Sequence, residues 1–336
     1  MAEFFDPMGD LLAEQAQVDV LVQDFSEEDW NKMASYCTTW KLKDVIAHIA
    51  FFDYCAAELL NGRGESVNAV ADAFSDQDEH FHVLKCQDMT GAEILSWWRE
   101  QRTIMNEAFI AGGPKSRVPW AAGIPPMSNR SLASARLMEL WAHSVDIYDA
   151  LGIEPVVKDR IASTLFLSWQ GRPNMYNVNG LTFDPEVPMY LELTLPSGEV
   201  WAKGDPASPN YIKGSARDWA LVAIRRRNWM DTDLEVVGDE ARTYASIVQT
   251  YAGPADPAPE AKNQRYSFSS LQGQVARPGC GEAPGRTGGL AAAISLGLHR
   301  MRDANYERRE ARALLVALRL PSLCRNAPQL SGHFYV

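Results

Sequence analysis

Four stretches of apolar residues at helical spacing occupy most of the first 151 residues of the chain. They cover residues 7–24, 41–61, 91–111 and 131–151, and the last three are each followed directly by a glycine. Apolar side chains that recur at i, i+3, i+4 and i+7 give a helix one apolar face, which has to be buried against a partner. The pattern therefore predicts an N-terminal four-helix bundle, a fold that builds sites from inward-facing side chains.

After Gly152 the pattern changes to one that includes strands. Residues 187–195 alternate apolar and polar side chains, and a Pro-Ser-Gly turn leads into 199–203, which predicts a β-hairpin. Further helices are expected at 158–170 and 216–228 and from 239 to the Gly253-Pro254 stop, with a short strand at 234–237. The predicted organisation is a bundle at 1–152, a small α+β domain at 153–258, and a Pro-rich linker with an irregular tail at 259–336.

Charge is distributed unevenly along the chain. The net charge is −11, which argues against nucleic acid as the main partner because phosphate binding needs a basic surface. Residues 263–336 hold ten Arg, no Lys and four acidic residues, a net charge of +6, whereas the preceding 262 residues carry a net charge of −17. This break leaves two hypotheses for the tail, an extension from an altered reading frame and a basic interaction arm.

Cysteine usage and hydropathy point to a reducing compartment. The five Cys form no C-x-x-C motif, and their odd number fits no closed disulfide framework. The N-terminus lacks the features of a secretory signal, and no uncharged apolar run reaches the roughly 18–20 residues that span a bilayer. We expect a cytoplasmic protein, a monomer or homodimer, with no membrane partner.

Three side chains in the bundle have the chemistry of a metal site. Glu139 and His143 are four residues apart, so they lie on one face of their helix. His48 lies on an apolar helical face, where we expect it to be buried. Two imidazoles and one carboxylate, with a fourth position open, are what a catalytic zinc requires. The residues alone leave an alternative open, a buried Glu–His ion pair and a separate core histidine.

Two segments around these side chains resemble a known family. The first is Trp40-x-x-x-Asp44-x-x-x-His48-Ile-Ala-Phe-Phe-Asp53, and the second is Arg136-Leu-Met-Glu139-Leu-Trp-Ala-His143-x-x-Asp146. Both are similar to the metal segments of the mycothiol-dependent maleylpyruvate isomerase branch of the DinB-like metalloenzyme superfamily. Gly171-Arg172-Pro173-x-x-Tyr176 and Gly214-Ser-Ala-x-Asp218 also look like that branch, which carries an extra C-terminal domain. The resemblance covers roughly residues 5–256.

The resemblance implies a divalent metal, zinc above all, held by His48, Glu139 and His143. It also implies a low-molecular-weight thiol such as mycothiol, which the metal ionises for attack on a small electrophile in an isomerisation or S-transfer. Nickel and iron share these ligands, so the metal stays open. The alternatives are a non-catalytic metal- or thiol-binding protein of the same fold and a metal-free helical scaffold.

The cluster Arg225-Arg-Arg227 has two interpretations. Arg226 is the candidate catalytic residue, because an arginine of the second domain could hold the carboxylate of a substrate or thiol cofactor. The alternative is a set of solvated charges at the end of a helix.

Other side chains near the predicted ligands are also open to more than one interpretation. Asp44 could orient His48 or favour the dipole of its helix. Asp146 is placed similarly after His143 and could orient it, although an acid at such a position is more often solvated. Cys55 is expected in the core. His80 and His82 are expected on the surface. Lys41 departs from the family pattern, because relatives commonly have a Thr or Ser cap there and lysine cannot accept the amide bonds of a helix start.

Overall fold

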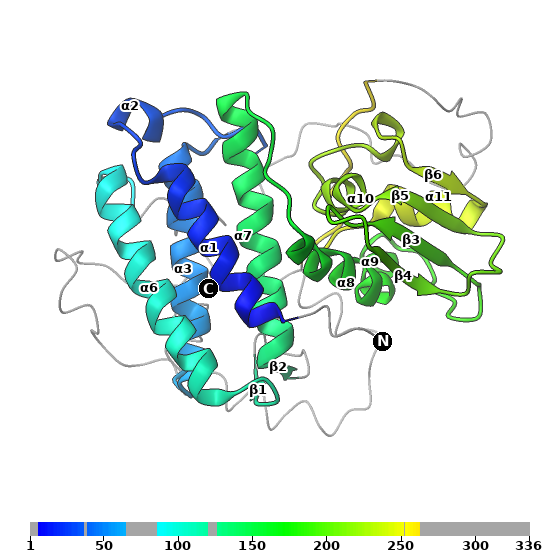
Figure 1. Ribbon diagram of the computed structural model, residues 1–336, viewed down its shortest axis with the longest axis horizontal. Coiled ribbons are helices and arrows are strands. Elements are labelled where there is room, and N and C mark those ends of the chain that lie inside the picture. The colour runs from blue at the N-terminus through cyan, green and yellow to red at the C-terminus, as the bar shows by residue number, and fades with distance from the viewer. Residues whose placement is uncertain (1–5, 37–38, 65–85, 120–125, 252, 263–336) are drawn as a thin grey trace, which may run out of the picture. The chain divides into compact units, whose positions relative to one another are not determined.

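A computed structural model describes residues 6–36, 39–64, 86–119, 126–251 and 253–262. A helical N-terminal region is followed by a small sheet domain (Figure 1), which confirms the expected α+β fold class. His80, His82 and the tail from residue 263 lie outside the described residues. The predicted domain limits at 152 and 258 stay a prediction.

The four expected long helices are all present. They are α1 (Pro7–Val22), α3 (Leu42–Leu60), α6 (Gly91–Gly112) and α7 (Asn129–Leu151), with the short α2 (Glu27–Trp30) between the first two. A two-stranded hairpin that the sequence pattern did not predict, β1 (Arg117–Val118) with β2 (Met127–Ser128), precedes α7. Ser128 then caps α7, because its hydroxyl accepts a hydrogen bond from the Ser131 amide at 3.1 Å.

Helix α3 begins at the expected place although Lys41 cannot cap it. The carboxylate of Asp44 accepts a hydrogen bond from the Lys41 amide at 2.8 Å, which is the acidic half of a capping box. Asp44 therefore stabilises the start of the helix, as one of its two interpretations expected. The C-terminal end falls at Asn61-Gly62, where Gly62 has a φ of 72°.

The described residues divide into two compact units, and the boundaries fall within α1 and within α7. Residues 16–133 form one unit, in which α3 and α6 pack along each other. Trp98 of α6 is fully buried there, and its indole N–H donates to the buried Asp53 carboxylate of α3 at 3.0 Å. Gly91 lets α6 start against Trp30, since a Cβ at this position would lie 2.0 Å from the indole.

The second unit, residues 6–15 and 134–262 of the described chain, contains the four-stranded sheet. The strands are β3 (Tyr190–Thr194), β4 (Val200–Gly204), β5 (Tyr211–Ser215) and β6 (Glu235–Val237), in the order β4-β3-β5-β6. Strand β3 is antiparallel to β4 and parallel to β5, and β5 is antiparallel to β6. The expected hairpin is therefore confirmed, and β5 is an addition that the sequence pattern did not reveal.

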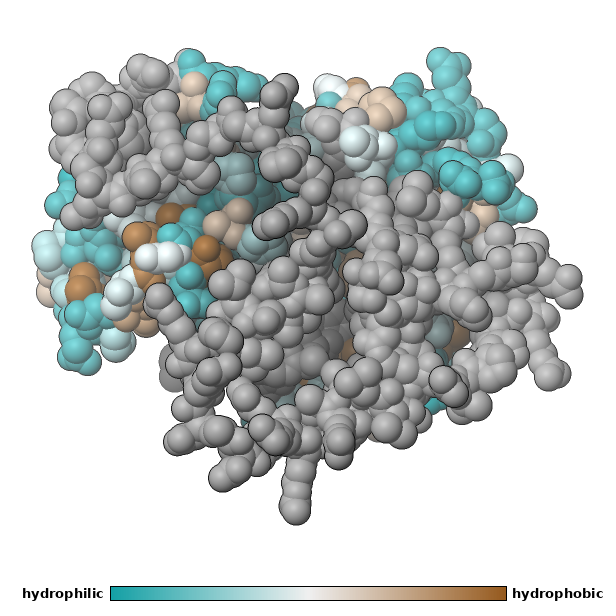
Figure 2. Space-filling view, turned by 180° about the vertical axis from the view of Figure 1, so that it is seen from behind, coloured by the Kyte–Doolittle hydropathy of each residue, from teal (hydrophilic) through white to brown (hydrophobic). Residues whose placement is uncertain are grey.

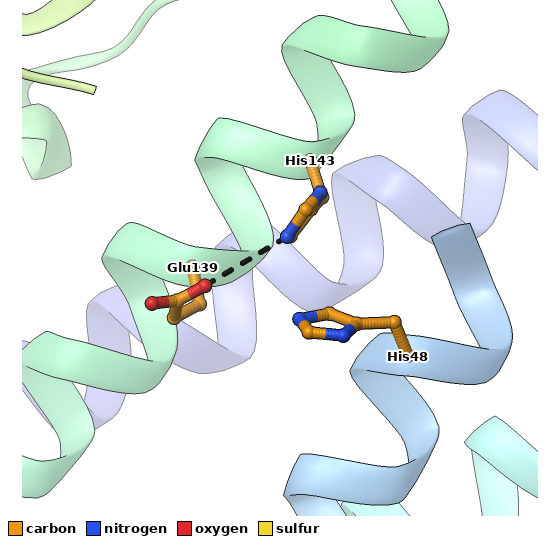
Figure 3. Close-up of side chains that lie close together, drawn as sticks. All are labelled: His48, Glu139 and His143. Atoms are coloured by element: carbon orange, nitrogen blue, oxygen red, sulfur yellow. Dashed lines mark ion pairs between the residues drawn. The ribbon is translucent and has the colours of Figure 1, made fainter. Parts of the chain in front are cut away.

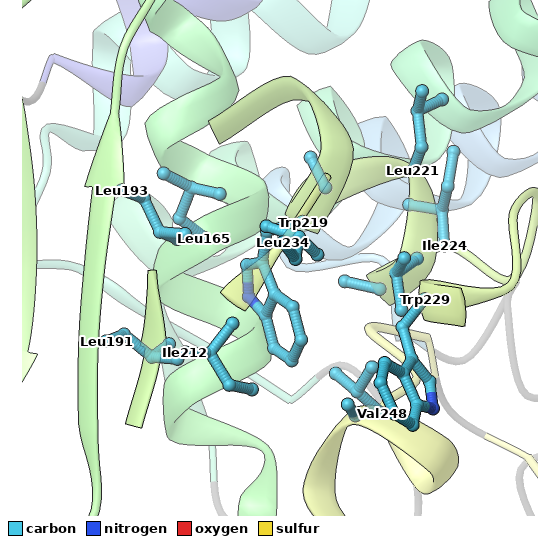
Figure 4. Close-up of a cluster of buried hydrophobic side chains, with 14 of the residues drawn as sticks. Leu165, Leu191, Leu193, Ile212, Trp219, Leu221, Ile224, Trp229, Leu234 and Val248 are labelled. Carbon is cyan, nitrogen blue, oxygen red and sulfur yellow. The ribbon is translucent and has the colours of Figure 1, made fainter. Parts of the chain in front are cut away.

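Side-chain alternation assigns the two faces of this sheet. Leu191, Leu193, Ile212 and Val236 are buried in one core with residues of α8 (Ala162–Gln170), α10 (Ala216–Ala223) and α11 (Asp239–Ile247). Figure 4 shows Leu165 and Trp219 among these side chains. Met138, Trp141, Ala142 and Val145 of α7 belong to the same core. The helix that carries Glu139 and His143 is thus anchored to the sheet domain by its own apolar face.

Three predicted helices differ in extent from those observed. The one at 158–170 is a 3₁₀ turn (Asp159–Ile161) that continues as α8, and a further helix, α9 (Arg172–Val178), follows without having been predicted. The one at 216–228 stops at Ala223, since Arg225 has a φ of 60°, in the left-handed region that ends a helix. The last helix stops at Ile247, six residues before Gly253.

The surface mixes polar and apolar residues. The residues coloured by hydropathy in Figure 2 are mostly hydrophilic, and the hydrophobic ones gather in smaller groups. Among the described residues, no helix has the length and hydropathy that a membrane span requires.

Candidate metal centre

Glu139 and His143 face each other along α7. The Nε2 atom of His143 lies 3.8 Å from a carboxylate oxygen of Glu139, the separation expected from residues one helical turn apart. His143 is buried and Glu139 is half-buried. The carboxylate and one imidazole nitrogen therefore point into the same small volume (Figure 3).

The other ring nitrogen of His143 is hydrogen-bonded to Asp146. Its Nδ1 atom lies 2.9 Å from Oδ2 of Asp146, whose side chain is fully buried. A carboxylate accepts a hydrogen bond from Nδ1–H, which leaves Nε2 of the neutral imidazole as the nitrogen with a free lone pair. The expectation that Asp146 is a solvated acid was wrong, because the face of α7 at this position is covered by the sheet domain to which the helix is anchored.

Arg226 completes this chain of contacts. Its Nε and Nη2 atoms donate to the two oxygens of Asp146 at 2.6 and 2.7 Å, and Nη1 donates to the Ile224 carbonyl at 3.0 Å. Burial alone would raise the pKa of the Asp146 carboxyl, but the Arg226 guanidinium and the contact with His143 hold that pKa below its ordinary value. Asp146 is therefore an anion that is paired on one side and orients an imidazole on the other.

Arg225 and Arg227, on either side of Arg226, also have hydrogen-bond partners within the chain. Arg225 donates to the Ser246 carbonyl at 2.8 Å, and Arg227 forms a two-bond pair with Asp149 of α7 at 2.9 and 3.0 Å. The alternative of three solvated charges was wrong, because Arg225 and Arg226 are buried. The turn after α10 places two of its arginines on two acids of α7, Asp146 and Asp149, which lie almost one helical turn apart.

His48 of α3 is surrounded by aromatic rings. Its imidazole centroid lies 5.0 Å from the ring of Trp40 and 4.8 Å from that of Phe52. Trp40 is buried, whereas His48 itself is half-buried, so it is less buried than its apolar face suggested. Cys55, one turn beyond Phe52, is fully buried, as expected of a core residue.

The three predicted ligands come together. His48, Glu139 and His143 each offer one ligand atom, and these atoms all lie within 4.8 Å of one another. Figure 3 shows the two imidazoles and the carboxylate side by side, from α3 and α7. The donor set fits a divalent metal of the zinc type, because it combines two imidazoles with one carboxylate and because Asp146 already fixes the tautomer of His143.

Sequence reasoning singled out the three candidate ligands and noted Asp146 beside His143, but it did not predict that Arg226 pairs with Asp146. Asp146 lies three residues after His143, on the same helical face, and that spacing was the available signal. The pairing of Arg226 with Asp146 had no local signal, because 80 residues separate the two. No contact in the structure tests the expected catalytic role of Arg226, which stays a prediction.

Comparisons with known proteins agree with the expected family. Residues 11–148 match the family model described as the mycothiol maleylpyruvate isomerase N-terminal domain. Two uncharacterized proteins of Mycobacterium tuberculosis, MT0041 and Rv0036c, are each 31% identical over 253 residues, which is 74% of this chain and 95% of theirs. The crystal structures of the mycothiol-dependent maleylpyruvate isomerase and of one of its mutants align with 67% of this chain and 92% of their own, with a TM-score of 0.45 and 11% identity.

Proposed function

We propose that this chain, which belongs to the mycothiol maleylpyruvate isomerase family, is a metal-dependent and thiol-dependent isomerase or S-transferase. The observation that carries the proposal is the group of His48, Glu139 and His143, whose ligand atoms lie within 4.8 Å of one another. These residues would hold the metal, with zinc as the first candidate. The thiol is mycothiol or a similar small molecule, and the second reactant is a small electrophile.

A divalent metal held by these residues would supply the positive charge that brings the pKa of a coordinated thiol close to neutrality, so that no separate base would be needed. Asp146 accepts a hydrogen bond from Nδ1–H of His143, which leaves Nε2 as the nitrogen that would bind the metal. Arg226 keeps Asp146 ionised and in this way supports the orientation of His143. Trp40 and Phe52 pack against the His48 ring and limit where it can lie.

The reaction class follows from the nucleophilicity of a thiolate. In the isomerisation, a carbon–sulfur bond forms at one carbon of a double bond, the remaining carbon–carbon single bond rotates, and the carbon–sulfur bond then breaks to return the thiol. In the S-transfer the carbon–sulfur bond is kept, and the other carbon takes up the proton that the thiol lost. Neither sequence changes the overall redox state.

The alternative is a metal- and thiol-binding protein without turnover, and one observation favours it. All three arginines of the 225–227 cluster already have partners within the chain, namely Ser246, Asp146 and Asp149. A substrate carboxylate would have to displace Asp146 to reach Arg226 in two-bond geometry. The cytoplasmic location and the monomeric or homodimeric state stay predictions.

One experiment separates these possibilities. N-acetylcysteine is mixed with the zinc-loaded protein at pH 7 and the released protons are counted, with mycothiol-dependent isomerisation of maleylpyruvate measured in parallel. The proposal predicts both proton release and turnover, each lost in Glu139→Gln and retained in Glu107→Gln, an exposed acid on α6. Proton release without turnover would favour the binding protein. No proton release from a zinc-loaded wild type would overturn the proposed thiol activation.

A further inference from the structure

The Gly171-Arg172-Pro173-x-x-Tyr176 motif lies in the sheet domain, and the metal centre makes no use of it. Arg172 is the first residue of α9, and its side chain is half-buried. Its guanidinium carbon stacks 3.5 Å above the centre of the Trp169 ring and lies 5.4 Å from that of Phe183 and 5.9 Å from that of Tyr244. A cation is thus held in a largely aromatic environment.

Arg172 forms no ion pair among the described residues, whereas most of the other described arginines do. Ion pairs of 4 Å or less are made by Arg63, Arg99, Arg102, Arg160, Arg217, Arg226, Arg227 and Arg242. Arg172 makes a single hydrogen bond among the described residues, from Nε to the Trp169 carbonyl at 3.3 Å. The positive charge is partly removed from water, and burial lowers its pKa, but it remains fully charged at neutral pH.

The edge of the guanidinium that carries Nη1 and Nη2 is available to a ligand. Neither atom donates to a described residue, and neither is among the buried unpaired atoms of the structure, so neither is sealed from solvent. The stacking on Trp169 and the Nε hydrogen bond fix the plane of the group. A guanidinium held in one plane binds a carboxylate through two parallel hydrogen bonds with less ordering of the side chain.

The charges near Arg172 determine which anions it would bind most tightly. Glu240, which accepts a hydrogen bond from the Tyr176 hydroxyl, is a carboxylate whose charge acts on Arg172. One cation beside one acid suits a singly charged carboxylate better than a doubly charged phosphate. Trp169 and Phe183 are both half-buried at the rim of the domain core, so each leaves part of a ring for a planar apolar group.

We propose that Arg172, Trp169 and Phe183 form a binding site for a small carboxylic acid with a planar apolar body. The carboxylate accepts from Nη1 and Nη2 of Arg172, and the apolar body lies along the exposed parts of the two rings. Glu240 lowers the affinity for anions of higher charge. This site uses none of His48, Glu139 and His143, so the proposal does not depend on the metal centre.

The test uses 4-fluorobenzoate as a probe and follows its ¹⁹F resonance during titration with the full-length protein, both before and after a chelator has removed metal. Saturable binding that the chelator leaves unchanged is expected. Arg172→Gln should weaken it about tenfold or more, because the hydrogen bonds to a charged group are lost. Arg242→Gln, which changes an exposed arginine paired with Asp239, should leave it unchanged. Acetate should compete for the site, and phosphate at equal ionic strength should not.

Two outcomes would overturn the proposal. Equal binding by the wild type and a folded Arg172→Gln protein, as judged by far-ultraviolet circular dichroism, would place the probe elsewhere. Binding that appears only in Glu240→Gln would mean that the Glu240 carboxylate pairs with the Arg172 guanidinium in solution and blocks the probe. A modest tightening in Glu240→Gln, on top of clear wild-type binding, is the result that the proposed site predicts.

Discussion

His143 and His48 have the same proposed task, and the chain holds them by different means. His143 is oriented by a buried chain of charges, from Asp146 to Arg226. His48 lies between the rings of Trp40 and Phe52, which contribute packing and no charge. The first arrangement fixes a tautomer and fails if one member is missing, because a buried charge without its partner is costly. The second restricts where a ring can lie and tolerates a change of shape.

The largest expected effect comes from breaking the charge chain. Arg226→Met leaves the Asp146 carboxylate buried without its cation, and it should lower the free energy of unfolding by about 3–5 kcal/mol in a urea titration. Arg242→Met removes an exposed pair and should cost about 1 kcal/mol or less.

A double variant sharpens this result. Arg226→Met combined with Asp146→Leu replaces the pair by apolar side chains and should recover most of the lost stability, since the buried charge is gone. A loss below 1 kcal/mol for Arg226→Met alone would contradict a buried ion pair at this position.

The next effect concerns the metal. Asp146→Asn keeps the shape of the side chain but removes the negative charge beside His143, and zinc affinity should fall about 10–100-fold in competition with a chromophoric chelator. Asp149→Asn is the matched control on α7, because Asp149 pairs with Arg227 and not with the imidazole. Equal zinc affinities in the two variants would remove Asp146 from the metal centre.

A smaller effect on zinc affinity is expected from changing an aromatic neighbour of His48. Phe52→Leu keeps an apolar side chain but loses the ring contact with His48, which is worth about 0.5–1.5 kcal/mol. Zinc affinity should therefore fall by roughly tenfold at most, by the same chelator assay. A loss as large as that of Asp146→Asn would mean that the two histidines depend on their surroundings to the same degree.

The smallest effect is expected for an ion pair near the surface. Asp19 of α1 accepts from Arg99 at 2.6 and 3.0 Å, and the hydrogen bonds with Arg99, opposed by burial and assisted by Arg102, hold the pKa of Asp19 below its ordinary value. Its contribution to stability is therefore present above the ordinary pKa of about 3.9 and is lost as the pH falls through the folded value. Asp19→Asn should cost roughly 0.2–1 kcal/mol at pH 7.

Urea titrations of wild type and Asp19→Asn at several pH values check this. The difference between them should shrink towards zero below pH 4 and should fall with added salt. A difference that stays constant down to pH 3 would show that the asparagine acts through packing and not through charge.

The elements that sequence reasoning found share one property, which is a strong local pattern. The helices around His48 and His143 repeat apolar residues every three or four positions, and the hairpin of β3 and β4 alternates around a Pro-Ser-Gly turn. The candidate ligands were identified from the same kind of pattern, since Glu139 and His143 are one helical turn apart and His48 lies on an apolar helical face. The family resemblance then joined the three.

The elements that it missed depend on distant parts of the chain. Strand β5 is short, and its pairing with β3 across a parallel ladder decides that it is a strand. Helix α10 stops where Arg225 turns so that Arg226 and Arg227 reach Asp146 and Asp149, a requirement of tertiary structure that no local propensity expresses. Asp146 was expected in solvent because nothing nearby in the sequence indicates that the sheet domain covers that face of α7.

Elemental analysis of the purified protein tests the central claim most directly. The wild type, His143→Ala and Glu107→Gln are purified, reconstituted with zinc and freed of excess metal in parallel. The metal centre predicts close to one metal ion per chain in the wild type and in Glu107→Gln, and almost none in His143→Ala. A wild type that holds no metal after reconstitution would contradict the metal centre and leave Glu139 and His143 as a structural pair.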